Sequence, residues 1–205
     1  MHQRTAEEIM IETEFRSTRA FTQAEFEEWA MSDRVPCTLY RYELLGGHVV
    51  MEPPAGYPHG ETAAALVALL YGAISAAKAG KVYGSSQGFA LPSGDTVEPD
   101  IAFVSCERLA TGPHPQFGKH LRIVPDLVVE ILSPSTRHRD QIEKREIYGQ
   151  NGVREYWIVD PIARQVTVVT FGHERATEVQ LQVGDALTSS LVPGLAATVG
   201  QLFDS

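Results

Sequence analysis

Three residues of this chain could together carry out phosphoester chemistry: Asp100, Glu130 and Lys144. Glu130 stands in the apolar segment DLVVEIL, residues 126–132, where an ionised carboxylate would be costly to bury. Such a group is tolerated when it pairs with a cation or coordinates a metal ion. The pattern therefore leaves two interpretations open for Glu130: a metal-binding or catalytic group, or the partner of an arginine such as Arg154.

Asp100 follows Pro99 at the start of a second apolar run. A Pro-Asp pair is common in turns, so Asp100 gains weight only in combination with Glu130. Two carboxylates on neighbouring strands can share Mg²⁺, which prefers oxygen ligands. A cation held there can polarise a phosphoryl oxygen and help to generate a hydroxide nucleophile. Asp100 and Glu130 are therefore candidate ligands of a divalent cation such as Mg²⁺, for which Mn²⁺ could substitute.

Lys144 lies in a segment, residues 136–150, that we expect to form a helix. Asp140, Lys144 and Tyr148 are spaced four residues apart and should share one helix face. One interpretation is a surface pair between Asp140 and Lys144, worth only about 0.3–0.5 kcal/mol. The other is a lysine that points at the attacking water or at the charge that develops on the phosphorus centre.

The elements that must position these residues follow from hydrophobic periodicity and turn signals. The expected elements are a helix over 22–31, a hairpin of 39–45 and 48–52 around Gly46-Gly47, a helix over 59–79, strands over 100–105, 126–132, 155–159 and 165–171, and a long loop over 106–124. This order is typical of a layered α/β or α+β domain with helices flanking a central sheet. We expect residues 1–20 to form a partly ordered arm and residues 21–205 to form a single domain.

Two segments resemble a known family. EPDIAFVS, residues 98–105, and the long block of residues 125–161 are similar to the Uma-type restriction endonuclease family of bacteria, a branch of the PD-(D/E)XK nuclease superfamily. YELLGGHVVMEPP, residues 42–54, followed by His59, resembles the N-terminal pattern of the same family. The resemblance covers residues 20–171 and implies a restriction-endonuclease-like core, a mixed central sheet flanked by helices, in which Asp100 and Glu130 bind the metal ion.

The chain departs from the superfamily pattern at one position. The pattern has a lysine two residues after the glutamate, where this chain has Leu132. In this branch the lysine stands on the following helix, and Lys144 matches that place. Glu43 and His59 also match family positions. Glu43 could instead cap the hairpin, and His59 could be a solvent-facing or helix-capping residue rather than one that reaches the metal through water.

The resemblance implies a Mg²⁺-dependent endonuclease that hydrolyses DNA, with Glu43, His59, Asp140 and Tyr148 in supporting positions. The net charge of −9 argues against a protein that coats nucleic acid through a broad basic face. The alternative is a catalytically inactive nucleic-acid-binding or assembly module of the same fold. We expect a homodimer, because cleavage of a duplex requires two active sites. The N-terminus lacks a signal-peptide pattern and no long apolar run suggests a membrane span, so we expect a cytoplasmic protein.

Overall fold

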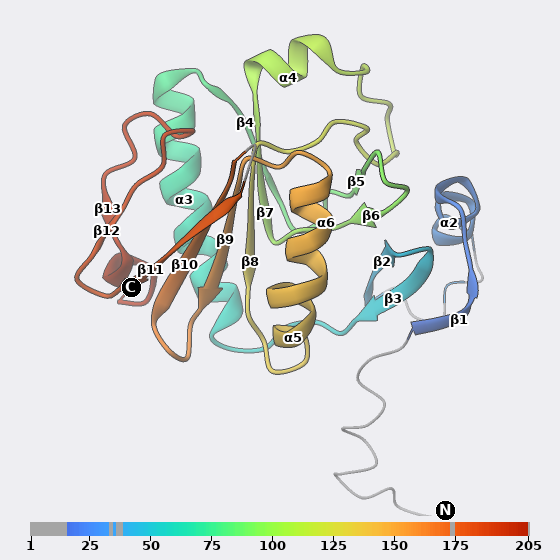
Figure 1. Cartoon of the computed structure of the whole chain (residues 1–205), viewed down its shortest axis with the longest axis horizontal. Coiled ribbons are helices and arrows are strands. Elements are labelled where there is room, and N and C mark those ends of the chain that lie inside the picture. The colour runs from blue at the N-terminus through green and yellow to red at the C-terminus, as the bar shows by residue number, and fades with distance from the viewer. Residues whose placement is uncertain (1–15, 33–34, 36–38, 173–174, 205) are drawn as a thin grey trace, which may run out of the picture.

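The computed structural model describes residues 16–32, 35, 39–172 and 175–204, whose two larger β-sheets lie side by side (Figure 1). The larger sheet has six strands in the order β11-β10-β9-β8-β7-β4. Its strands are β4 (Gly80–Gly84), β7 (Ile101–Ser105), β8 (Leu127–Ile131), β9 (Glu155–Asp160), β10 (Gln165–Phe171) and β11 (Ala176–Gln182). β8 and β9 run parallel and the other neighbours run antiparallel, so the expected mixed central sheet is confirmed.

The smaller sheet is built mainly from the N-terminal part of the chain. Its strands are β1 (Arg16–Ala20), β2 (Arg41–Leu45), β3 (His48–Glu52), β5 (Phe89–Ala90) and β6 (Thr96–Val97), in the order β1-β3-β2-β6-β5. The expected hairpin is β2–β3, and Asp95 Oδ1 accepts a hydrogen bond of 2.7 Å from the main-chain N–H of Gly46 in its turn. The expected N-terminal helix is α2 (Gln23–Ala30), which begins with a capping box between Thr22 and Glu25. Residues 1–15 of the expected arm lie outside the described residues.

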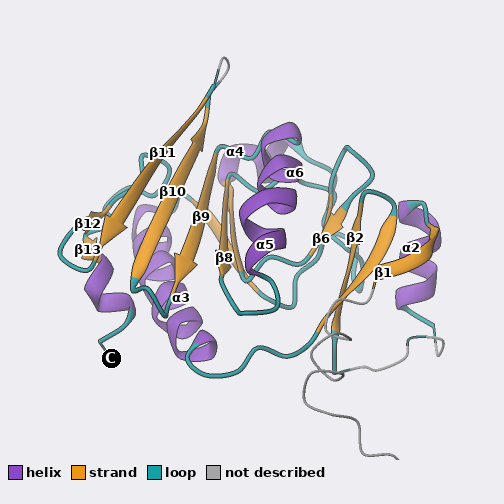
Figure 2. Cartoon of the chain, turned by 60° about the horizontal axis from the view of Figure 1, so that its bottom comes forward, coloured by secondary structure: helices purple, strands orange, loops and turns teal. Residues whose placement is uncertain are grey.

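Helices cover both faces of the six-stranded sheet (Figures 1 and 2). On one face lies α3 (His59–Ala77), whose Leu66, Leu70 and Ile74 are buried against the sheet. By length and composition α3 could cross a membrane, and in the structure one of its faces packs on the sheet. On the other face lies a segment made of α5 (Arg137–Arg139), the π-helical turn η1 (Asp140–Lys144) and α6 (Arg145–Gln150).

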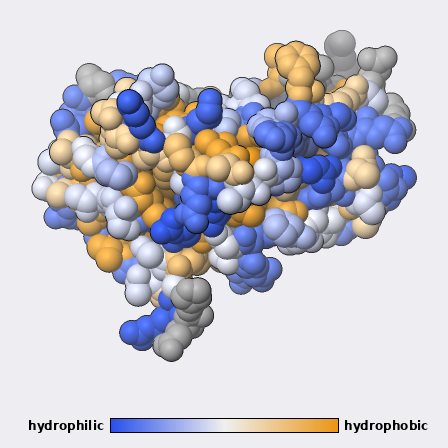
Figure 3. Space-filling view, turned by 90° about the horizontal axis from the view of Figure 1, so that it is seen from above, coloured by the Kyte–Doolittle hydropathy of each residue, from blue (hydrophilic) through white to orange (hydrophobic). Residues whose placement is uncertain are grey.

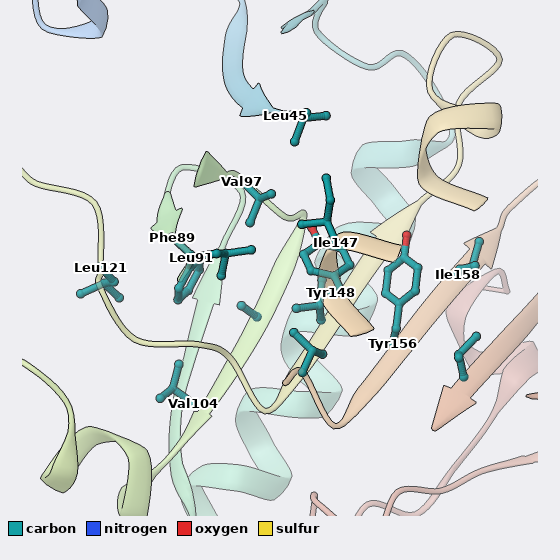
Figure 4. Packing of buried hydrophobic residues seen from close by; sticks show 14 of the residues in the cluster. Leu45, Phe89, Leu91, Val97, Val104, Leu121, Ile147, Tyr148, Tyr156 and Ile158 are labelled. Carbon is teal, nitrogen blue, oxygen red and sulfur yellow. The ribbon is translucent and has the colours of Figure 1, made fainter. Parts of the chain in front are cut away.

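The face under α6 holds the core that joins the two sheets. Tyr148 of α6 packs beside Tyr156 of β9, with ring centroids 5.0 Å apart. Leu45 of the smaller sheet belongs to the same cluster, which Figure 4 shows from close by. This shared core fixes the hairpin β2–β3 relative to β8 and α6, and so it fixes the position of the polar residues between them.

Two expectations need correction. The segment 136–150 is helical, but it contains the π-helical turn η1 rather than a continuous α-helix. The segment 106–124 is not all loop, because α4 (Cys106–Thr111) opens it. Ser105 caps α4 by accepting a hydrogen bond from the N–H of Arg108, and the Arg108 guanidinium donates to the carbonyl of Val124. The glycines and prolines that predicted a loop lie beyond this helix.

The remaining elements lie at the C-terminal end, where β12 (Ala186–Leu187) pairs with β13 (Ala197–Thr198) and the 3₁₀ turn η2 (Val199–Leu202) follows. Seen from above, the surface has mainly hydrophilic residues at the α2 end, on the right of Figure 3, and more hydrophobic ones towards the middle. The acidic composition of the chain is thus compatible with a layered domain that buries its apolar strands.

Candidate active site

Polar side chains from four parts of the chain meet between the two sheets. They are Arg41, Glu43 and Glu52 of the hairpin, His59 at the start of α3, Asp100 and Glu130 of the larger sheet, and Arg139, Asp140, Lys144 and Tyr148 of the helical segment. All except Arg41 and His59 are buried. The structure therefore brings together every residue that the sequence singled out, and it adds three others.

Asp100 and Glu130 lie side by side because their strands are paired. Ile101 is opposite Val129 in the antiparallel register of β7 and β8. The main-chain N of Asp100 is 3.4 Å from Glu130 Oε2, and Asp100 Oδ2 accepts a hydrogen bond of 2.9 Å from the main-chain N of Ile131. The two carboxylates are thus held by the backbone of the sheet, which is a rigid mounting for a binding site.

Lys144 reaches Glu130 from the helical segment. Its Nζ is 3.0 Å from Glu130 Oε1, 2.9 Å from Glu43 Oε2 and 3.3 Å from Glu52 Oε1. The interpretation of Asp140 and Lys144 as a surface pair is therefore wrong: both side chains are buried, and their charged atoms are 3.8 Å apart. Lys144 is the cation around which the site is arranged.

Glu130 accepts hydrogen bonds from two side chains at the same oxygen, Oε1. Tyr148 Oη donates to Glu130 Oε1 at 2.6 Å, and Lys144 donates to the same oxygen. Arg154, the alternative partner considered for Glu130, instead reaches Asp126 at 3.4 Å. Because Oε1 holds both donors, Glu130 Oε2 is left on the side of Asp100.

His59 and Arg41 contact Asp100 from the side of the smaller sheet. His59 Nε2 is 3.0 Å from Asp100 Oδ2, and Arg41 Nη1 donates to Asp100 Oδ1 at 2.9 Å. His59 is therefore part of the site and not a solvent-facing residue. Although burial alone would lower the pKa of His59, the hydrogen bond and charge of Asp100 raise it. Although burial alone would raise the pKa of Asp100, contact with His59 and Arg41 lowers it.

Glu43 does not cap the hairpin turn. The residue that accepts a hydrogen bond from the main chain of this turn is Asp95. Its Oε1 accepts a hydrogen bond of 2.7 Å from the N–H of Glu98, and its Oε2 faces Lys144. Burial raises the pKa of Glu43 to about 8, because the attraction of Lys144 is offset by repulsion from Glu52. Glu43 is thus a buried partner of the lysine.

Sequence reasoning did not identify the ion pairs that Glu52 forms with Arg41 and Arg139. Arg41 pairs with Glu52 at 2.8 Å, and Arg139 also forms an ion pair with Glu52. Burial opposes the charge of Glu52, but Lys144 and the two arginines lower its pKa to about 2. A signal was present in the sequence: Arg41 is opposite Glu52 in the hairpin, and alternation puts Glu43 on the same face.

The buried charges do not balance. Five carboxylates, those of Glu43, Glu52, Asp100, Glu130 and Asp140, face three cations, those of Arg41, Arg139 and Lys144. Burial raises the pKa of Glu130 to about 7, and Asp100 and Asp140 add repulsion that Lys144 does not cancel. For Lys144, burial opposes the charge, but Glu130, Glu43 and Glu52 hold its pKa well above the usual value. The lysine therefore stays protonated.

These residues fit a small, hard divalent cation. A cavity of about 10 Å³, roughly the space of one water molecule, is bounded by Asp100, Glu130, Asp140 and Glu52. Asp140 Oδ1 is buried there without a hydrogen-bond donor among the described residues. Within that part of the chain, no three His, Cys, Asp or Glu side chains converge as a ready metal-binding group. Asp100 and Glu130 would thus provide two oxygen ligands and leave the rest to water and substrate, as is usual for Mg²⁺.

A cleft gives access to this site. It has a volume of about 810 Å³, and Asp100, His59, Arg41 and Glu98 lie at one end of it. Lys144 and Glu130 are not among its lining residues. A substrate in the cleft would therefore meet Asp100 and His59 first, with Glu130 and the lysine behind them.

Glu43 makes the stability of the protein depend on pH. Its pKa is raised from 4.5 to about 8, so its contribution to stability is complete below pH 4.5 and is lost as the pH rises towards 8. In EDTA, we expect the Glu43→Gln variant to show a weaker fall in the free energy of unfolding between pH 5 and pH 8 than the wild type. Urea unfolding at each pH measures this. Glu107→Gln, at an exposed glutamate, is the control, and equal slopes for all three proteins would contradict the expectation.

Comparisons with known proteins identify the family and the fold of the chain. The model of the Uma2 family, described as "Putative restriction endonuclease", matches residues 24–200. A solved structure described as "a putative nuclease belonging to DUF820", from Anabaena variabilis, has the same fold with a TM-score of 0.75. It is 17% identical, and the alignment covers 90% of this chain and 98% of that one. A search of curated proteins finds no match. Because the family model spans most of the sequence, including every residue of the site, the chain belongs to the Uma2 family of restriction-endonuclease-like proteins.

Proposed function

We propose that this protein is a metal-dependent endonuclease that hydrolyses phosphodiester bonds of DNA, with Asp100 and Glu130 as the ligands of Mg²⁺ or Mn²⁺. Family and fold support a nuclease. The observation that carries the proposal is the pair of carboxylates Asp100, which directly precedes β7 and lines a cleft, and Glu130, on the paired strand β8, with the ammonium group of Lys144 against Glu130. When bound, the cation supplies Lewis-acid activation of the phosphoryl group and of water.

The residues of the chain have distinct roles in this proposal. Lys144 keeps its proton, so it acts as a fixed positive charge and not as a general base. It holds Glu130 Oε1 together with Tyr148 and so leaves Oε2 for the cation. Arg41 and His59 orient the Asp100 carboxylate through different oxygens, Arg41 at Oδ1 and His59 at Oδ2. His59 also lies where it could bind or transfer a proton at a phosphate oxygen in the cleft.

Cleavage of plasmid DNA tests the proposal. Purified protein should nick plasmid in Mg²⁺ or Mn²⁺ and not in EDTA. The Asp100→Asn variant, which loses the charge but keeps the shape of the side chain, should be slower by about 10²–10³-fold. Asp185→Asn, at an exposed aspartate, is the matched control and should keep the wild-type rate. Cleavage by Asp100→Asn at the wild-type rate would remove Asp100 from the site.

Two further parts of the proposal concern the setting of the activity. We expect the protein to work in the cytoplasm as a homodimer, because duplex cleavage needs two sites. β11 has an exposed edge in the six-stranded sheet, and strands at such an edge can pair with another chain.

The alternative function is a nucleic-acid-binding or assembly module without catalysis. Titration calorimetry separates the two functions. If it detects no binding of Mg²⁺ or Mn²⁺, the alternative is favoured.

A further inference from the structure

The cleft in front of the site has walls of unusual composition for a protein that acts on DNA. Met31, Leu39, Tyr40 and Tyr42 line it on the side of the smaller sheet, and His120 lines it as well. Leu39 is 77% exposed, at the rim of the cleft. The volume of about 810 Å³ falls within the roughly 300–1,000 Å³ of pockets that enclose small molecules. A space of this size suits one or two nucleotides rather than a double helix.

The aromatic rings of the cleft have firm support. Tyr40 packs against the cluster of Phe26 and Tyr42 under α2. The ring of His120 stacks on Phe26, with centroids 5.9 Å apart and an angle of 17° between the planes. Aromatic side chains of this kind bind nucleobases by stacking, which does not depend on base identity.

Among the described residues around the cleft, cations that could bind the phosphates of a duplex are scarce. Of the lining residues that the structure describes, Arg41 is the one Lys or Arg, and it is paired with Glu52 and Asp100. Lys119 and Arg122, close to His120 in the sequence, both reach Glu27. A duplex-binding protein gains most of its affinity from phosphate contacts by such residues, whereas this cleft offers rings and apolar side chains.

We infer that the cleft binds unpaired nucleotides, so that the substrate is single-stranded DNA or an unpaired stretch within a duplex. The bases would stack on Tyr40 and on the apolar rim at Leu39, and the backbone would pass Asp100 and His59. The cleavage of such a substrate rests on the proposed nuclease function. The preference for binding unpaired nucleotides does not depend on it.

Binding and cleavage of matched DNA molecules test the inference. Fluorescence anisotropy in Ca²⁺ compares a labelled single strand with the same strand in a blunt duplex, and cleavage in Mg²⁺ compares kcat/KM for the two. We expect tighter binding and faster cleavage of the single strand, and of a duplex with an unpaired gap. Equal or tighter binding of the blunt duplex, or no binding of the single strand, would overturn the inference.

Two variants connect the preference to the cleft. Tyr40→Leu removes the ring and should weaken single-strand binding by roughly tenfold or more. Tyr71→Leu, at a 61% exposed tyrosine of α3 that does not line the cleft, is its control and should have no effect. Leu39→Glu adds a charge at the exposed rim without touching the core, and it should also weaken single-strand binding. Ile162→Glu, at a 73% exposed position elsewhere, is its control. Equal effects within both pairs would place the binding outside this cleft.

The outcomes separate the two proposals. Single-strand binding that depends on Tyr40, without cleavage in any metal, would refute the nuclease function and keep the inference. Metal-dependent cleavage of blunt duplex, without preference for unpaired DNA, would keep the nuclease function and refute the inference.

Discussion

Replacement of Lys144 by methionine is expected to lower the free energy of unfolding by about 3–5 kcal/mol at neutral pH, the range measured when one partner of a buried ion pair is removed. Lys144 Nζ lies within 3.3 Å of carboxylate oxygens of Glu43, Glu52 and Glu130. Methionine preserves most of the volume of the side chain, so the loss comes from uncompensated negative charge and not from a cavity. Urea unfolding of the metal-free protein measures it.

The origin of this loss can be tested within the same experiment. If the loss of stability in Lys144→Met is electrostatic, it should be smaller at pH 5 than at pH 8. At pH 5 the carboxyl groups that face residue 144 take up protons and lose their charge. Glu43→Gln in the Lys144→Met background should restore part of the stability, which a double-mutant cycle quantifies. Lys81→Met, at an exposed lysine of β4, should change stability little. A loss at Lys144 no larger than that at Lys81 would show that the buried charge cluster does not hold the domain together.

Replacement of Glu130 by glutamine is expected to slow metal-dependent DNA cleavage by about 10²–10³-fold or more while the protein remains folded. The amide keeps an oxygen that can accept from Lys144 and Tyr148, whose donor atoms lie 3.0 and 2.6 Å from the carboxylate. It removes the negative charge next to Asp100 that would hold the cation. Initial rates of cleavage measure the loss of activity, and thermal unfolding shows whether the variant remains folded.

The matched control for Glu130 is a second buried glutamate in the same sheet. Glu155 begins the neighbouring strand β9, and its carboxylate accepts a hydrogen bond of 2.6 Å from Trp157 Nε1. Trp157 belongs to the core under α3, on the face of the sheet opposite to Glu130. Glu155→Gln should therefore keep the cleavage rate of the wild type. If both variants cleave DNA at the same rate, Glu130 does not bind the catalytic metal.

The sequence predicted the strand-borne half of the site well. Glu130 stands out in the sequence because it is a carboxylate within an apolar strand, where burial of a lone charge is costly. The four-residue spacing of Asp140, Lys144 and Tyr148 predicted that they face the same way, and all three are indeed buried on the side of Glu130. The central sheet and its flanking helices followed from periodicity, and the family resemblance implied that the sheet is mixed; the four expected strands are β7, β8, β9 and β10 of the six-stranded sheet.

The hairpin half of the site was harder to predict. Arg41 and Glu52 look like ordinary surface charges of a short hairpin, because local patterning does not reveal that a second sheet covers their face. Their burial depends on the contact between β2–β3 and a segment roughly a hundred residues further along the chain. The π-helical turn at Asp140–Lys144 was invisible for a similar reason: its residues are ordinary helix formers, and the site rather than their propensity selects this geometry.

The division of the charged cluster between two sheets has a consequence for the order in which the protein can fold. A ribosome completes the hairpin with Glu43 and Glu52 long before it reaches Lys144, since synthesis proceeds from the N-terminus. Until then the hairpin has acidic groups that no lysine neutralises, and Leu45 has no α6 to pack against. The face of the smaller sheet that carries Glu43 and Glu52 is therefore covered only when residues 140–148 dock on it, and a partly synthesised chain would have no assembled site.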